Sequence, residues 1–192
     1  MTGKAEMTTS PMSLLDNLLP HYQFQECHRI AIRAPAAAIM RSIRAYRALH
    51  DPLIRLAIGL REGPARLLGR RPGPMLDLDD FTILGREGER EIVFGLMGAF
   101  WKADYGLVPL SSAACFHESH HPGLCRLAMG FAIAPLSGDI RRVTTRTRVF
   151  CPTPASQRRF APYWYAIRPV SGLIRRRMLG RIRAMAQRPS PS

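Results

Sequence analysis

The last part of this chain lacks acidic residues altogether. Of the 192 residues, 28 are Lys or Arg and 14 are Asp or Glu, and the last acidic one is Asp139. Residues 140–192 contain thirteen arginines, so this segment holds +13 of the formal net charge of +14. Lysine is scarce too, because only Lys4 and Lys102 occur. This balance excludes an acidic solvating protein, and it favours arginine chemistry, which pairs bidentately with phosphate or carboxylate.

Segments that would target or anchor the chain are also lacking. Residues 1–20 contain one lysine and no apolar core of about 7–15 residues, so no secretory signal is predicted. No run reaches the roughly 18 apolar residues that cross a bilayer. The four cysteines, Cys27, Cys115, Cys125 and Cys151, form no Cys-x-x-Cys pair. We therefore expect free buried thiols and a cytoplasmic protein.

Periodicity divides the chain into helices and strands of one domain. The length and the 46% hydrophobic content predict a single globular domain over residues 13–187, with flexible ends at 1–12 and 188–192. The predicted order is a short helical turn at 13–19, a strand at 24–33, helices at 36–49 and 52–60, strands at 81–85, 91–101, 106–110, 124–135 and 140–151, and a helix at 155–187. Turns are expected at Gly88 and Gly138, a Ser- and His-rich loop at 111–123, and a kink or break in the last helix near Pro169.

The strand at 140–151 alternates most regularly. Val143, Thr145, Thr147 and Val149 share one side, and an arginine row expected to be solvated occupies the other. An antiparallel sheet needs at least one face covered, and the last helix is the only element long enough to cover it. The sequence thus predicts an α+β fold with a curved antiparallel sheet wrapped around a long C-terminal helix. The wedge between them is either packed shut or a ligand cavity.

Five segments resemble a known superfamily. They are IAIRAPAAAIMRSI (30–43), REIVFGLMGAFW (90–101), MGFAIAPL (129–136), RVTTRTRVFCP (142–152) and YWYAIRPVSGLIRRRML (163–179). With the element order, they resemble the helix-grip fold of the START-like superfamily, also called SRPBCC, which includes polyketide cyclases and Bet v 1-like allergens, and one group of its bacterial members in particular. The resemblance implies a fold and a cavity for a small apolar molecule. It supplies no catalytic residues.

The wedge would have a largely apolar lining with a few hydroxyl groups. The side chains expected to line it are Phe94, Leu96, Met129, Phe131, Ile133, Val143, Thr145, Thr147, Val149, Trp164, Ile167, Ile174 and Met178. Such a lining suits a lipid, polyketide, terpenoid or aromatic molecule, and the nine methionines would make it adaptable. The alternative is that these residues simply form the core. Our first hypothesis is therefore binding or carriage of a small hydrophobic ligand.

The second hypothesis is an enzyme of cyclase, dehydratase or hydrolase type acting in the same cavity. It would need a base near the pocket, and the candidates are His28, His117 and Glu118. No nucleophile motif or phosphate-binding loop is present, so the catalytic residues stay unknown. We predict no metal and no cofactor, since the spacing of Cys115, His117 and His120 does not match zinc-ligand spacings.

A third hypothesis concerns the arginines that crowd the last helix. Arg175, Arg176, Arg177, Arg181 and Arg183, with Arg188 beyond them, would form a patch for anionic surfaces. A peripheral contact with an anionic membrane fits a protein that collects an apolar ligand there. Nucleic acid is the less favoured partner, because no nucleic-acid-binding signature is present. The alternative is a solvated helix face, and the oligomeric state stays open.

Overall fold

The described part of the chain forms one open sheet with helices on both sides. The computed structural model describes residues 13–47, 80–102, 104–119 and 121–188. The elements in chain order are α1 (Leu14–Leu18), β1 (Phe24–Arg33), α2 (Ala36–Ala45), β2 (Thr82–Glu87), β3 (Glu91–Gly98), α4 (Ala113–Glu118), β4 (Cys125–Ser137), β5 (Ile140–Phe150) and α5 (Pro154–Ala186). The helix predicted at 52–60 lies outside the described residues.

The sheet is antiparallel throughout. Its strand order is β1-β5-β4-β3-β2, so β1 and β2 are the two edges. The β2–β3 and β4–β5 connections are tight turns at Gly88 (φ 50°) and Gly138 (φ 48°), a backbone region that glycine adopts at little cost. Both turns were predicted from the sequence. The α+β class, the antiparallel sheet and the long C-terminal helix are confirmed, and the arrangement is compatible with a helix grip.

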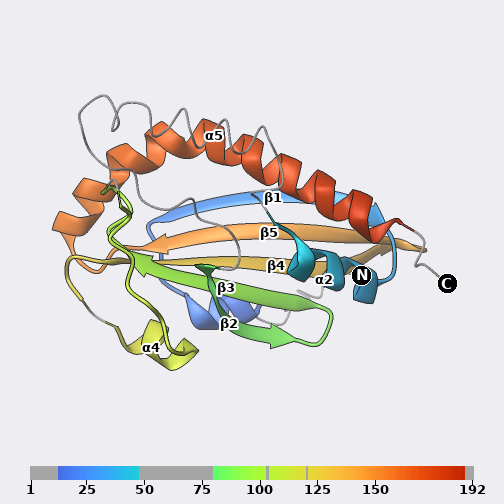
Figure 1. Cartoon of the computed structure of the whole chain (residues 1–192), viewed down its shortest axis with the longest axis horizontal. Helices are drawn as coiled ribbons and strands as arrows, with labels where there is room; N and C mark the ends of the chain where they lie inside the picture. Colours follow the sequence, from blue (N-terminus) through green and yellow to red (C-terminus); the bar gives the residue numbers. More distant parts are fainter. Residues whose placement is uncertain (1–12, 48–79, 103, 120, 189–192) are drawn as a thin grey trace, which may run out of the picture.

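Helix α5 begins at a well-defined cap. Thr153 and Ser156 cap each other's backbone, and Pro154 takes the first turn, where its missing N–H costs nothing. The helix then continues for 33 residues through Pro162 and Pro169. Of the kink or break predicted near Pro169, the break is therefore wrong, because the helix is continuous, and Figure 1 shows it arching over the sheet. It packs against α2 and the edge strand β1.

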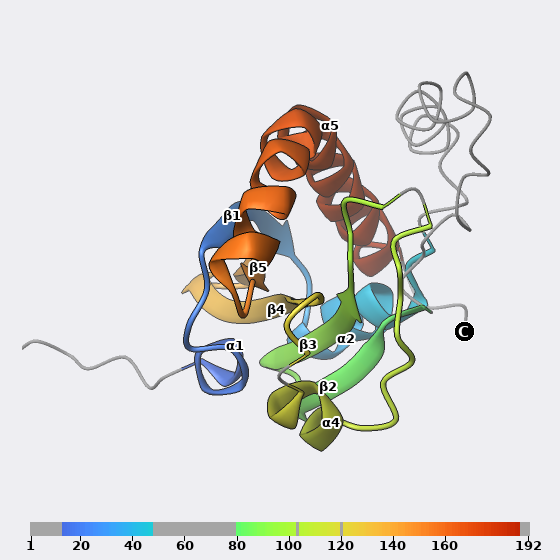
Figure 2. The same cartoon turned by 90° about the vertical axis from the view of Figure 1, so that its left-hand side faces the viewer.

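Each face of the sheet has its own apolar core. On the face toward α5, called here the inner face, one cluster centres on Phe94, Phe131 and Met178 and a second on Phe24, Phe160 and Trp164. Figure 2 shows α1 and α4 on the opposite side of the sheet from α5. There a third cluster packs leucines of α1 and α4 residues against the outer face.

The outer covering corrects one prediction. The arginine row of β5 was expected to be solvated, but Arg148 is buried beneath α1. Its guanidinium donates to Asp16, to Gln25 Oε1 (2.9 Å) and to the Leu19 carbonyl (3.1 Å), and it stacks on Tyr22 at 4.3 Å. Burial alone would raise the pKa of Asp16, but hydrogen bonds from Ser13 and Arg148 outweigh it and lower that pKa.

Three other expectations also differ from the structure. The strand predicted at 106–110 is absent from the described residues except for one bridge between Val108 and Met97, because a turn at Tyr105 and Gly106, both with positive φ, ends β3 early. The loop predicted at 111–123 contains α4, capped by Ser112. The helix predicted at 36–49 ends at Ala45, where the backbone turns extended.

Candidate functional site

Polar side chains interrupt the inner face between its two apolar clusters. The register sets Glu26 of β1 opposite Thr147 of β5, and His28 opposite Thr145. Continuing across β4, Thr147 pairs with Met129 and Thr145 with Phe131. Because side chains alternate along a strand, all of these residues lie on the face toward α5. A polar patch thus occupies the β1–β5 side of an otherwise apolar surface.

The residues predicted to line the wedge lie between the sheet and α5. Phe94, Met129, Phe131, Ile133, Val143 and Met178 belong to one buried cluster, with Ile174 packed against it. Leu96, Val149 and Trp164 belong to the other. Thr145 and Thr147 are buried between these clusters, and Ile167 is half-buried. The structure therefore brings the set together, chiefly as packed core.

The middle of α5 is less buried than its two ends. Fully buried positions stop at Trp164 and resume at Met178. The intervening inward positions Ile167, Ser171 and Ile174 are only half-buried. The helix therefore packs tightly onto the sheet at both ends, while its middle, which contains Pro169, closes over the polar patch less completely.

A groove opens where this half-buried stretch passes the edge strand. Its volume is about 600 Å³. It is lined by Gln25, Glu26, Cys27 and His28 of β1 and by Tyr165, Arg168, Pro169, Gly172, Leu173 and Arg176 of α5. Tyr165 and Leu173 are unusually exposed for apolar side chains, at 63% and 53%. None of the residues predicted to line the wedge borders this groove.

Glu26 and His28 form a close pair at the wall of the groove. His28 Nε2 lies 2.6 Å from Glu26 Oε1, and the two side chains are only 16% and 9% exposed. The other oxygen of Glu26 accepts from Ser171 Oγ at 2.9 Å, which ties the pair to α5. A side chain at Gly172 would crowd this contact, because its Cβ would lie 3.3 Å from Glu26 Oε1. Of the three candidate bases, the structure brings only His28 to this site.

Two buried polar atoms near this pair have no hydrogen-bond partner. They are Arg175 Nε and Thr145 Oγ1, and neither finds an acceptor or donor in the part of the chain that the structure describes. The Nη1 atom of Arg175 contacts the sulfur of Met129 and lies 4.0 Å from that of Met178. Burial lowers the pKa of Arg175, and the charge of Glu26 opposes this only in part.

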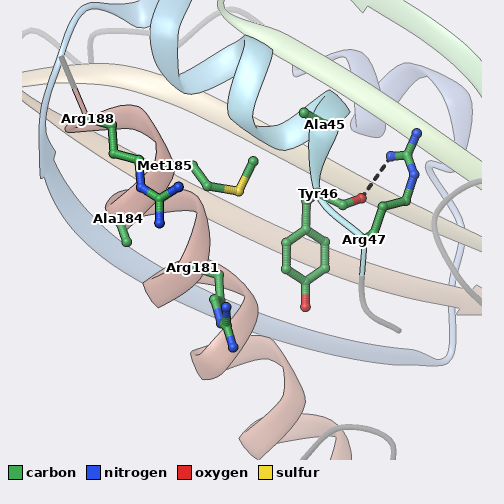
Figure 3. Close-up of a pocket in the computed structure, with 7 residues that line it drawn as sticks. All are labelled: Ala45, Tyr46, Arg47, Arg181, Ala184, Met185 and Arg188. Carbon is green, nitrogen blue, oxygen red and sulfur yellow. Dashed lines mark hydrogen bonds between the residues drawn. The ribbon is translucent and has the colours of Figure 1, made fainter. Parts of the chain in front are cut away.

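The arginines predicted to form one surface patch fall into different environments. Arg176, Arg181 and Arg183 are exposed, whereas Arg175 and Arg177 are half-buried, and the Nε atom of Arg175 is fully enclosed. Figure 3 shows a second pocket, of about 250 Å³, where Arg181 and Met185 of α5, with Arg188 just beyond its end, lie around Tyr46 at the end of α2. Arg47 donates to the Tyr46 carbonyl there. The pocket is smaller than the roughly 300 Å³ at which ligand sites begin.

The remaining candidates lie far from the groove. His117 and Glu118 belong to α4, on the outer side of the sheet, and His120 is outside the described residues. Across residues 13–47, 80–102, 104–119 and 121–188, no group of three or more His, Cys, Asp or Glu is arranged to hold a metal. The thiols differ from expectation, because Cys27 and Cys115 are exposed whereas Cys125 and Cys151 are buried with their sulfurs 2.9 Å apart.

Comparison with known proteins adds no constraint on the site. No family model, no curated protein and no solved structure matches this chain. Within the described residues, no helix combines the length and the apolar character needed to span a membrane. The groove and the polar patch behind it are therefore the features of this protein that point to a function.

Proposed function

We propose that this protein is a helix-grip protein of the START-like type and binds a small hydrophobic ligand between α5 and the inner face of the sheet. The ligand enters through the groove beside β1. The observation that carries this proposal is the groove of about 600 Å³, whose volume lies within the usual range for ligand sites of about 300–1,000 Å³.

The surroundings of the groove support the same proposal. Tyr165 and Leu173 expose apolar surface on its α5 side, where an apolar ligand would cover it. Ile167 and Ile174 lie along the half-buried stretch of the helix that leads inward. A ligand there gains affinity from apolar area removed from water, and Glu26, His28 and Ser171 orient it through polar contacts.

The test is displacement of the neutral fluorescent probe N-phenyl-1-naphthylamine by a library of lipids, polyketides, terpenoids and aromatic compounds. Leu173→Ser removes apolar surface at the groove, and we expect affinity to fall by about five- to tenfold, the equivalent of roughly 1 kcal/mol of lost burial. Leu136→Ser is the matched control, because Leu136 is also an exposed leucine, 43% accessible, and lies at the end of β4, away from the groove. Equal effects of both substitutions would contradict binding at the groove.

Thiol labelling locates the bound ligand independently. Cys27 lines the groove and is exposed, whereas Cys115, which is also exposed, lies on α4. A bound ligand should slow modification of Cys27 by iodoacetamide and leave Cys115 unaffected. If no compound of the library binds, and native mass spectrometry of protein purified from its own host finds no ligand, the proposed function is refuted.

The Glu26–His28 pair favours a second candidate, an enzyme acting on the same ligand. When Nε2–H donates to Glu26, the other ring nitrogen of His28 remains available as a proton acceptor. This is the geometry in which a carboxylate orients an imidazole base. Hydrolysis of p-nitrophenyl esters of increasing chain length tests the hydrolase form of this candidate. His28→Gln should abolish turnover while probe binding persists, and turnover unchanged by His28→Gln would exclude His28 as the base.

A further inference from the structure

Arg175 is half-buried, and its Nε atom is fully enclosed without a hydrogen-bond partner among the described residues. It follows Ser171 by four residues and precedes Met178 by three, a spacing that turns it toward the sheet. There its Nη1 meets the sulfur atoms of Met129 and Met178, and its Nε is enclosed without a partner among the described residues. Thioether sulfur is a weak acceptor, so these contacts replace little of the hydration that the guanidinium loses.

The carboxylate whose charge acts on Arg175 already has other hydrogen-bond partners. Glu26 attracts Arg175 through its charge, but its two oxygens are engaged by His28 Nε2 at 2.6 Å and by Ser171 Oγ at 2.9 Å. No hydrogen bond joins Glu26 to Arg175 among the contacts of the described residues. A guanidinium has five donors, and burying it without pairing is costly.

A second donor lies on the sheet beneath the guanidinium. Thr145 Oγ1 is buried and has no partner within the described residues. Thr145 of β5 pairs with Phe131 of β4, and Met129 is two residues before Phe131. Thr145 and Met129 are therefore diagonal neighbours on the same face, about 7–8 Å apart. The Thr145 hydroxyl and the Arg175 guanidinium therefore both lie close to Met129, beside the polar patch.

We propose that Arg175 binds the carboxylate of an amphiphilic acid, with the Thr145 hydroxyl as an additional donor to the same group. This inference rests on the proposed function, and it names the ligand class of that site. Guanidinium and carboxylate match geometrically and form two parallel hydrogen bonds, which are the strongest pairing available to arginine. The apolar body of the acid lies against the half-buried stretch of α5.

The experiment compares acids with neutral partners of the same shape, on delipidated protein. The probes are dodecanoic acid against dodecan-1-ol, and 2-naphthoic acid against 2-naphthylmethanol, each measured by displacement of N-phenyl-1-naphthylamine. The wild type should bind the acid of at least one pair about tenfold or more tightly than its alcohol. Arg175→Met should abolish this preference and preserve affinity for the alcohol. Arg159→Met, an exposed arginine on the first turns of the same helix, controls for the lost charge and should retain the preference.

A spectroscopic measurement needs no variant. The ¹³C resonance of carboxyl-labelled dodecanoic acid should titrate, when bound, at a lower pH than in free solution, since a neighbouring cation favours the carboxylate. If acid and alcohol bind equally, or if the bound carboxyl titrates as in water, the inference is overturned while ligand binding stands. If neither pair displaces the probe and no compound of the library displaces it either, the proposed function itself is refuted.

Discussion

The clearest physical consequence of the site concerns the stability of the ligand-free protein when Arg175 becomes methionine. Replacing buried charged groups with hydrophobic residues of similar volume often stabilises a protein by about 1–4 kcal/mol. Here the gain arises because Nε has no partner within the described residues, and because Met129 and Met178 already form an apolar environment for the new side chain. Methionine also retains the unbranched stem that packs beneath α5.

The expected size follows from the length of the chain. For a domain of this size, each 1 kcal/mol shifts the melting temperature by about 2–4 °C. A gain of about 2 kcal/mol should therefore raise Tm by about 4–8 °C. Most substitutions of buried residues lower Tm, so a rise is a specific signature. Thermal unfolding of delipidated protein, followed by circular dichroism, measures it, with Arg159→Met as the control for the change in net charge.

The difference in Tm between the wild type and Arg175→Met should shrink or change sign when a tightly bound acid is present. A ligand at about 100 times its Kd stabilises the folded state by about 2.7 kcal/mol. The wild type gains this stabilisation and the variant gains less, so the advantage of Arg175→Met should shrink or invert. A fall in Tm for the ligand-free variant would refute the reasoning, because it would mean that the guanidinium is already paired in the folded protein.

Three further predictions concern the rest of the fold. Ellman's reagent should react quickly with the exposed Cys27 and Cys115 of the native protein, and with all four thiols after unfolding. In the folded protein the hydrogen bond with Cys151, and then burial, raise the pKa of the Cys125 thiol. Since the pKa of Asp16 is lowered on folding, its stabilisation, about 1 kcal/mol for a partly exposed pair, is complete above the unfolded value of about 3.9 and fades as pH falls below it. Urea unfolding from pH 6 to pH 2.5 should show this loss, and Asp16→Asn should flatten it. Gly98→Ala should lower Tm, because its Cβ would lie 2.7 Å from the Tyr105 carbonyl, whereas Gly180→Ala, with open space around it, should raise stability by about 1 kcal/mol.

Strand periodicity carried most of the fold prediction. The bounds of β1 were predicted correctly, and the inward set of Val143, Thr145, Thr147 and Val149 lies on the predicted face, because a period of two leaves no alternative once one face is buried. The outer face could not be predicted in this way. Whether Arg148 is solvated depends on α1, a short helix far away in sequence, and alternation alone carries no information about what covers the second face.

The predictions of short elements were wrong where local hydrogen bonds competed with the hydrophobic pattern. Residues 106–110 have a strand-like composition, but Asp104 accepts the Gly106 N–H at 3.1 Å and fixes a turn that diverts the chain from the sheet. Helix α4 was missed because its six residues contain little periodicity. A usable signal was present nonetheless, since Ser112 caps the helix by accepting the Cys115 N–H at 3.2 Å, three residues onward.

The position of Arg175 shows how the site itself could have been found from the sequence. Grouping residues 175–177 as one basic run treated three arginines as equivalent, although successive helical positions point about 100° apart. The lining predicted from the last helix already included Ile167, Ile174 and Met178. Arg175 lies three residues before Met178, so the same periodicity assigns it to that inward face and sends Arg176 outward. A charged residue on the inward face of a helix needs a partner, and where the described residues offer its side chain hydrogen-bond contacts with sulfur atoms alone, a ligand is the natural source of one.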